Sequence, residues 1–74
     1  MSQVDLVIKA LGGPTQASWE LSKLTGRPIS YASIQAWRRR PTGIPLHMRT
    51  IMFQGAETLG IKDNRPVLEY LQPR

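Results

Sequence analysis

Helix-breaking residues recur along this chain, and they limit every regular element to a few turns. The breaks fall at Gly12-Gly13-Pro14, Gly26-Arg27-Pro28, Pro41-Thr42-Gly43 and Gly60. Glycine ends helices in a left-handed conformation, and proline disrupts a helix interior. Between the breaks, apolar residues follow the i, i+3, i+4, i+7 spacing of a helix face, without the alternation of strands. The sequence therefore predicts an all-α fold of four to five short helices.

The apolar spacing also predicts which side chains face the core. These are Val4, Val7, Ile8 and Leu11, then Ala17, Leu21 and Leu24, then Ile34 and Trp37, and finally Met48, Ile51, Met52, Ala56 and Leu59. Trp19 falls outside its stripe and is expected at a neighbouring element or a subunit contact. Gly55 costs a helix about 1 kcal/mol relative to alanine, which predicts a close helix crossing or a bend. Residues 61–74 are expected to form a fifth helix or an arm.

Residues with capping and turn chemistry predict where the helices begin. Thr15 is expected to cap the second helix and Ser30 the third, because a side-chain hydroxyl accepts a free N–H of the first turn. Ile29 and Ile34 flank this second cap as a hydrophobic staple, which sets the angle at which the chain enters the third helix. Pro45 suits the first position of the fourth helix, where no N–H is needed.

The composition argues against several classes of function. The 74 residues suffice for one domain, and the absence of cysteine excludes disulfides and thiolate metal sites. His47 is the only histidine, which leaves too few ligands for a zinc site. No glycine loop cradles a phosphate, and the acids show no pairing suited to acid–base catalysis. We expect no enzyme activity, no metal, no cofactor and no small-molecule ligand.

The hydropathy pattern contains no candidate membrane span. No apolar run approaches the roughly 20 residues that a spanning helix needs. The first residues also lack the basic-then-apolar order of a signal peptide. The sequence thus predicts a soluble cytoplasmic protein that does not bind membranes.

The positive charge is concentrated in the middle of the chain. The net charge is +5, and the excess lies entirely in residues 21–56, which hold no acidic residue. The basic residues there are Lys23, Arg27, Arg38, Arg39, Arg40 and Arg49. A local block of one sign is typical of proteins that bind polyanions. The alternative is a solvated basic face that serves solubility.

The segment ISYASIQAWRRRP, residues 29–41, combines a buried edge with a polar surface. Ile34 and Trp37 form the apolar edge, and the other side chains are small, polar or basic. Two short helices joined by a tight connection form a helix-turn-helix when the second helix is apolar on its inner face and polar and basic on its outer face. The major groove of B-DNA is about 12 Å wide and admits one such helix. Gln35 can pair with adenine and Arg39 with guanine, or either can reach only a phosphate.

Three motifs in order make the interpretation more specific. "LGGPTQA", then "GRPISYASIQAWRRRPTGIP", then a helix ending "LGI" resemble the Cro and repressor-type helix-turn-helix proteins of phages and prophages. The resemblance covers about residues 4–61 and is strongest to a small subgroup with Leu-Gly-Gly-Pro-Thr, Trp-Arg-Arg and Ile-Pro. It implies a DNA-binding domain over residues 1–61. Residues 62–74 would then be a tail or short helix available for a dimer contact.

The resemblance also implies roles for single residues. With Ile34 as the core position of the recognition helix, the residues expected to touch bases are Tyr31, Ala32, Gln35, Ala36 and Arg39. The resemblance also implies that Thr15 and Gln16 approach phosphates. The charge distribution adds Arg27, Arg38 and Arg40 as phosphate contacts, with Lys23 and Arg49 as further candidates, and Ser33 is expected at a phosphate as well. Two alternatives remain open: Tyr31 can rest its ring on the scaffold, and residues 38–40 can be a solvated last turn that the helix dipole favours.

These observations predict a sequence-specific regulator of transcription that binds double-stranded DNA. It would be phage- or prophage-derived, associated with the nucleoid of a bacterial host, and dimeric on a pseudo-palindrome. The helix over residues 48–59 or the segment 67–71 would form the dimer surface. The alternative is a protein-binding module, such as an antitoxin or a phage-encoded inhibitor of a host protein. Sequence-independent coating of nucleic acid is disfavoured because the basic region, beyond Tyr31, lacks aromatic residues for stacking.

Overall fold

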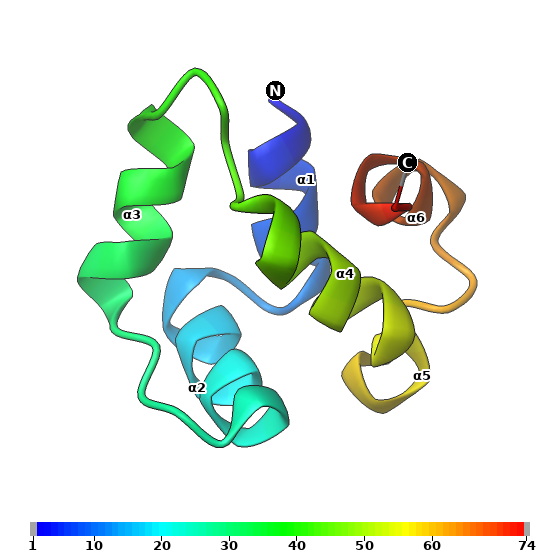
Figure 1. Ribbon diagram of the computed structural model, residues 1–74, viewed down its shortest axis with the longest axis horizontal. Coiled ribbons are helices and arrows are strands. Elements are labelled where there is room, and N and C mark those ends of the chain that lie inside the picture. The colour runs from blue at the N-terminus through cyan, green and yellow to red at the C-terminus, as the bar shows by residue number, and fades with distance from the viewer. Residues whose placement is uncertain (1, 74) are drawn as a thin grey trace.

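The computed structural model describes residues 2–73, in which six α-helices and no strand are present. They are α1 (Gln3–Ala10), α2 (Pro14–Thr25), α3 (Tyr31–Arg39), α4 (Leu46–Gln54), α5 (Ala56–Leu59) and α6 (Arg65–Leu71), as Figure 1 shows. The all-α prediction is confirmed, but the predicted number of four to five helices is too low. None of these helices is long and apolar enough to cross a membrane.

The additional helix arises at Gly55, where the predicted fourth helix divides into α4 and α5. A Cβ atom at this position would lie 2.7 Å from Cδ1 of Leu24 on α2. Of the two alternatives that the sequence predicts at Gly55, a close helix crossing or a bend, the bend is confirmed. A side chain at this bend would require the tip of Leu24 to move.

Two predicted helix starts are wrong by one or two residues. Gly13 is the N-cap of α2 and Pro14 occupies the first turn, so Thr15 lies inside the helix rather than capping it. The fixed φ of proline and its missing N–H favour this arrangement. Pro45 is the N-cap of α4 rather than its first helical residue, so the helix begins one residue later than predicted, at Leu46. Ser30 caps α3 as predicted, and its Oγ accepts the N–H of Ser33 at 3.1 Å.

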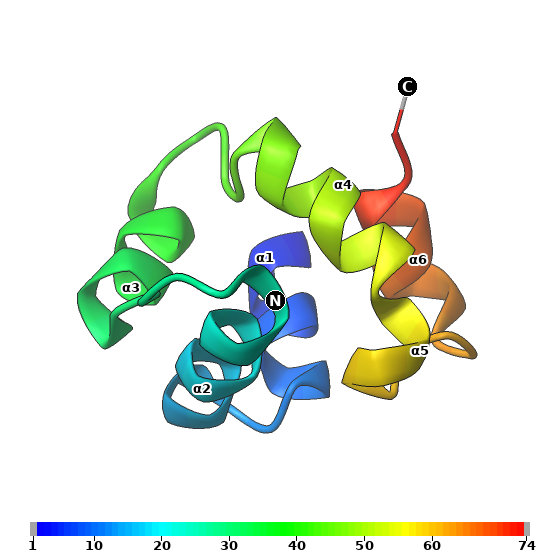
Figure 2. The ribbon, with the colours of Figure 1, turned by 60° about the horizontal axis from the view of Figure 1, so that its bottom comes forward.

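The core gathers the inner edges of all six helices. The buried apolar residues are Val4, Val7, Ile8, Leu11, Ala17, Leu21, Ile34, Trp37, Ile44, Met48, Met52, Ala56, Ile61, Val67 and Leu71. Leu24, Ile51 and Leu59 are half-buried against them. The helix α1 packs against α2, α3 and α6 and lies between the last two in both views (Figures 1 and 2). The predicted core stripes are therefore confirmed.

The C-terminal segment belongs to the same core. Val67 and Leu71 of α6 are buried, and the helix packs against α1 and α4. Of the two predicted forms of this segment, the short helix is confirmed for the described residues. Met48 and Met52 of α4 are buried as well, so the apolar residues expected at a dimer surface are used inside the chain.

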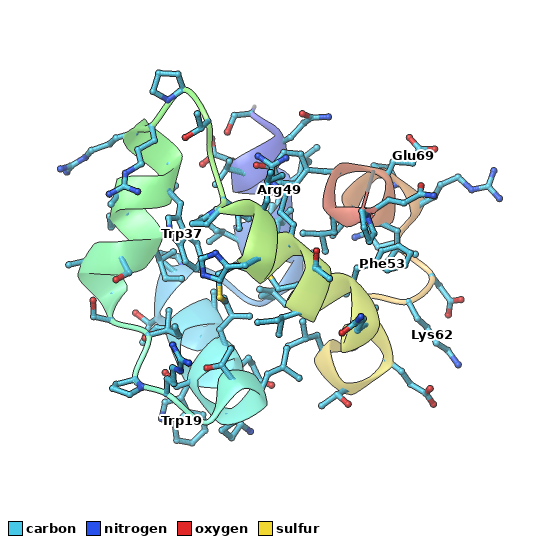
Figure 3. The ribbon with its side chains drawn as sticks, in the orientation of Figure 1. Trp19, Trp37, Arg49, Phe53, Lys62 and Glu69 are labelled. Carbon is cyan, nitrogen blue, oxygen red and sulfur yellow. The ribbon has the colours of Figure 1, made fainter. Side chains whose placement is uncertain are left out.

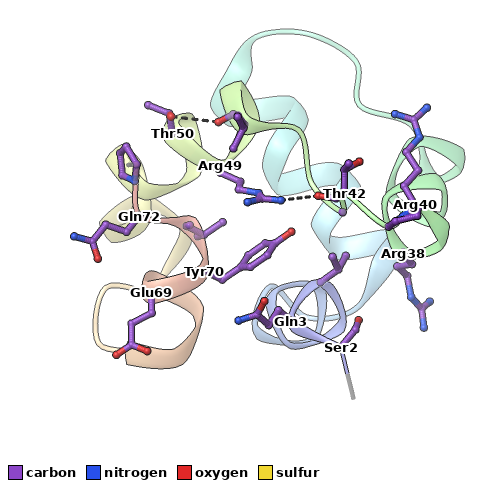
Figure 4. A pocket seen from close by; sticks show the side chains of 16 residues that line it. Ser2, Gln3, Arg38, Arg40, Thr42, Arg49, Thr50, Glu69, Tyr70 and Gln72 are labelled. Carbon is purple, nitrogen blue, oxygen red and sulfur yellow. Dashed lines mark hydrogen bonds between the residues drawn. The ribbon is translucent and has the colours of Figure 1, made fainter.

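The connection between α3 and α4 is held by Arg49 and Tyr70. The Arg49 guanidinium donates to the carbonyl oxygens of Thr42 at 2.6 Å and Ile44 at 2.7 Å, and it stacks 4.3 Å from the centre of the Tyr70 ring (Figure 4). The Tyr70 hydroxyl accepts the N–H of Ile44 at 3.1 Å. Arg49, predicted at a phosphate, thus ties the backbone of this connection to α6.

Gly43 is buried in this connection with φ at 68°, and a Cβ atom there would overlap the Tyr70 hydroxyl and lie 2.9 Å from Cγ2 of Val4. Gly43→Ala is therefore expected to lower the free energy of unfolding by about 2–4 kcal/mol, through left-handed strain plus the clash. Gly26→Ala is the matched control, because Gly26 has φ at 70° and open space around it. Gly26→Ala should lower the free energy of unfolding by only about 1 kcal/mol. Urea denaturation measures both, and equal losses would contradict the proposed clash.

Candidate nucleic-acid interface

The turn between α2 and α3, residues 26–30, is fixed by two serine hydroxyls. The Ser18 Oγ donates to the carbonyl oxygen of Ile29 at 2.5 Å, and the Ser22 Oγ accepts the N–H of Ile29 at 2.9 Å. The carbonyl oxygen and the N–H of Ile29 are thereby both hydrogen-bonded to α2. The sequence alone does not predict this role, although Ser18 and Ser22 stand at the i, i+4 spacing of one helix face. Their contacts fix the direction in which α3 leaves the turn.

The helix α3 buries one edge and exposes the other. Ile34 is fully buried and Trp37 nearly so, and Figure 3 shows Trp37 between α3 and the rest of the bundle. Ile29 is half-buried against the same core, as the predicted staple requires. Ala32 and Arg39 are exposed, whereas Ser33, Gln35 and Ala36 are half-buried. The residues predicted at bases thus line the outer surface of one short helix.

Polar side chains form a hydrogen-bonded row along this surface. The Gln35 Nε2 donates to the Tyr31 hydroxyl at 3.0 Å, and the Arg38 Nη1 donates to Gln35 Oε1 at 2.9 Å. The Arg38 Nε in turn donates to Asp5 Oδ1 on α1 at 2.7 Å. Tyr31 is 50% exposed, so its hydroxyl joins this row while half of its surface remains open. We call Tyr31, Gln35, Arg38 and Asp5 the polar row.

The polar row corrects one inference from the sequence. The basic block of residues 21–56 holds no acidic residue, yet Asp5 pairs with Arg38 across 33 positions of the chain. The hydrogen bond from Arg38 is the main cause that lowers the pKa of Asp5, and a hydrogen bond from Ser2 adds to it. Lys23 also has an acidic neighbour, since its Nζ lies 3.5 Å from Glu20 Oε1. A count of charge along the chain missed both pairs because their acids lie outside residues 21–56.

Three other arginines remain open to a ligand. Arg27, Arg39 and Arg40 are exposed, and none has an acidic partner among residues 2–73. Arg40 follows α3 and borders a polar cleft between α1, the α3–α4 connection and α6, with Thr42 and Arg49 beside it (Figure 4). Figure 4 also shows Arg38 and Arg40 pointing away from each other. Arg38 lines this cleft as well, so the two side chains border the same cleft but extend in different directions.

The start of α2 lies close to Arg38. A shallow hollow is lined by Asp5, Gly12, Gly13, Pro14 and Arg38, so the first turn of α2 and the last turn of α3 border the same surface. The N-cap Gly13 makes no side-chain hydrogen bond to this turn. Thr15 is exposed there. Gln16 is exposed too, but its Nε2 donates to Glu20 Oε1 at 2.9 Å.

Comparison of the chain with protein-family models, with curated proteins and with solved structures finds no match.

The pairing of Asp5 with Arg38 makes a testable prediction about titration. Arg38→Met should raise the pKa of Asp5 toward its ordinary value, because the main hydrogen bond to the carboxylate is lost. Since the folded-state pKa is depressed, the pair stabilises the fold above the unfolded pKa, and this contribution is lost as the pH falls through the folded pKa. NMR titration of the Asp5 carboxyl carbon measures the shift. Arg40→Met is the control and should leave that pKa low; equal values in both variants would contradict the pairing.

Proposed function

We propose that the protein is a sequence-specific regulator of transcription that binds double-stranded DNA through α3. The observation that carries the proposal is the exposed surface of this helix. Its buried edge is reduced to Ile34 and Trp37, while its outer side chains are small, polar or basic. A helix that enters the major groove needs this division, since one edge must hold the scaffold while the other meets base edges.

The chemistry of the outer side chains matches the groove. Ala32 and Ala36 are small enough for the backbone to come close to the bases. Gln35 offers the donor and acceptor that pair with adenine, and Arg39 offers the paired donors that suit guanine. Tyr31 supplies an aromatic edge at the start of the helix. These five residues are the proposed base contacts.

Phosphate contacts would come from the surroundings of α3. Arg27 in the preceding turn and Arg40 after the helix are exposed cations without acidic partners in residues 2–73. The first turn of α2, with Thr15 and Gln16, presents backbone N–H groups that favour an anion. Ser33 adds a hydroxyl at the edge of α3. The resemblance to phage Cro and repressor proteins implies that α2, the turn and α3 act as a helix-turn-helix, and the packing of α2 against α3 supports this proposal.

The proposed setting follows from the same resemblance. The protein would act in the cytoplasm of a bacterial host, as a phage- or prophage-derived repressor, Cro-like switch or activator. Its site would be a pseudo-palindrome occupied by two copies, because one helix reads too few base pairs for a useful specificity.

A dimer needs surface that the core leaves exposed. Trp19 on α2 and Leu46 at the start of α4 are 66% and 74% exposed, and Figure 3 shows Trp19 at the outer edge of α2. We expect sedimentation equilibrium to detect a dimer on the protein's DNA site at micromolar concentration. Trp19→Ser and Leu46→Ser, each made alone, should identify the side chain that supports it. A monomer on DNA in the unchanged protein would contradict the dimer.

Fluorescence anisotropy with two duplexes tests the function directly. One duplex carries the DNA that flanks the protein's own gene, and the other is a scrambled duplex of equal composition. We expect a preference of about a hundredfold or more for the first. If roughly four to six phosphates are contacted, log affinity should fall with log salt at a slope of about −4 to −5. Equal affinities would contradict sequence-specific binding, and no binding at low salt would favour the protein-binding module.

Substitution of Arg39 and of Arg40 distinguishes contacts with bases from contacts with phosphates. Arg39→Ala should relax sequence preference, because a base contact is lost, whereas Arg40→Ala should weaken binding to all sequences alike. Arg39→Ala should weaken binding to the preferred sequence by about 1–3 kcal/mol. Arg40→Ala should reduce the slope of log affinity against log salt by roughly one. Anisotropy against the preferred and scrambled duplexes gives both quantities. Identical effects of the two substitutions would show that neither residue reads a base.

A further inference from the structure

We propose that Asp5, on α1, is a positioning residue that determines specificity: through Arg38 it sets the orientation of the Gln35 amide on α3. This inference rests on the proposed function, because it concerns how α3 reads DNA. It assigns a role in sequence reading to a residue that lies outside the helix expected to enter the groove.

Asp5 is well placed to hold Arg38 still. It belongs to the first turn of α1, where its N–H donates to Ser2 Oγ at 3.1 Å, and its side chain is only 32% exposed. The helix α1 packs directly against α3. The carboxylate therefore sits on a fixed support, and its 2.7 Å contact with Arg38 Nε restrains the long arginine side chain.

The restrained arginine leaves the Gln35 amide one favourable orientation. Arginine has only donors, so the amide atom that faces Arg38 Nη1 must be the oxygen, Oε1. The NH₂ group then faces the Tyr31 hydroxyl, which can accept its hydrogen. After these contacts Oε1 retains a second lone pair and Nε2 a second hydrogen, and both remain for a base.

The orientation of this amide carries sequence information. Glutamine pairs with adenine by donating from Nε2 to N7 and by accepting at Oε1 from the N6 amino group. Reversing the amide reverses the order of donor and acceptor across the groove, along the edge of the base pair. A fixed amide therefore distinguishes A·T from T·A at the contacted base pair, whereas an amide free to turn accommodates both.

Asp5 also pairs with a positive charge, that of Arg38, which would otherwise contribute to non-specific binding of DNA. Contacts with phosphates supply essentially all of the affinity for random sequence. Arg38 would join those contacts if its guanidinium were free, but Asp5 competes with the phosphates for it. The same carboxylate thus sharpens base reading and weakens binding to unrelated DNA, and both effects raise the specificity ratio.

The test compares Asp5→Ala with Asp63→Ala, which removes the same charge from an exposed position in the turn between α5 and α6, across the molecule from α3 (Figure 1). Each protein selects its preferred sites from a pool of randomised duplexes. We expect Asp5→Ala to lose the distinction between A·T and T·A at one position. It should also bind random-sequence duplex roughly threefold to tenfold more tightly, with a salt slope steeper by about 0.9. Asp63→Ala should retain the wild-type motif and slope.

A second arm shows whether Asp5 acts through Gln35. In protein that already carries Gln35→Ala, Asp5→Ala should cause no further loss at that base pair, although the steeper salt slope should persist. Thermal unfolding followed by circular dichroism confirms that each variant is folded. An Asp5→Ala protein with the wild-type motif and slope would overturn this inference alone. A wild-type protein that selects no motif would overturn the proposed function and the inference together.

Discussion

The burial of one edge of α3 is the contact on which the proposed interface depends. A helix of nine residues is not stable alone in water, so α3 gains its stability from packing. Ile34 and Trp37 provide that packing, and full burial of a large apolar side chain contributes about 1.5–3 kcal/mol. Because the buried residues of α3 lie on one edge of the helix, the outer positions are free to carry side chains chosen for chemistry.

Both ends of α3 are also tied to the rest of the bundle. At its start, Ser18 and Ser22 bind the backbone of Ile29. After its end, Arg49 binds the backbone of the connection to α4, and Tyr70 supports the same connection from α6. A helix held in this way loses little conformational freedom on binding, which is the usual advantage of a preorganised site. The C-terminal helix therefore supports the proposed interface although it lies away from it.

Much of this fold could be predicted from the sequence, because its signals are local. The helix period identified the core edges, and the cap at Ser30 followed from its hydroxyl. The start of α2 could not be placed correctly because Gly13, Pro14 and Thr15 each suit a helix terminus. The contact of Gly43 with Tyr70, the ties to Ile29 and the partner of Arg38 depend on tertiary packing. Such packing brings together residues whose spacing along the chain carries no signal.

The charge distribution gains a different meaning once the chain is folded. Along the sequence, residues 21–56 form an uninterrupted basic block, but in space Arg38 is paired while Arg27, Arg39 and Arg40 are not, among residues 2–73. A small domain that attracted DNA with every cation would bind all sequences well and distinguish few of them, because electrostatic affinity is independent of sequence. If α3 reads DNA as proposed, the pairing of Arg38 with Asp5 reduces electrostatic attraction at the position where Gln35 must be held in one orientation. In the proposed interface, Arg27 and Arg40 would supply the remaining attraction to phosphates, while Gln35 and Arg39 would read bases. Affinity and specificity would then reside largely on different residues of the same short segment.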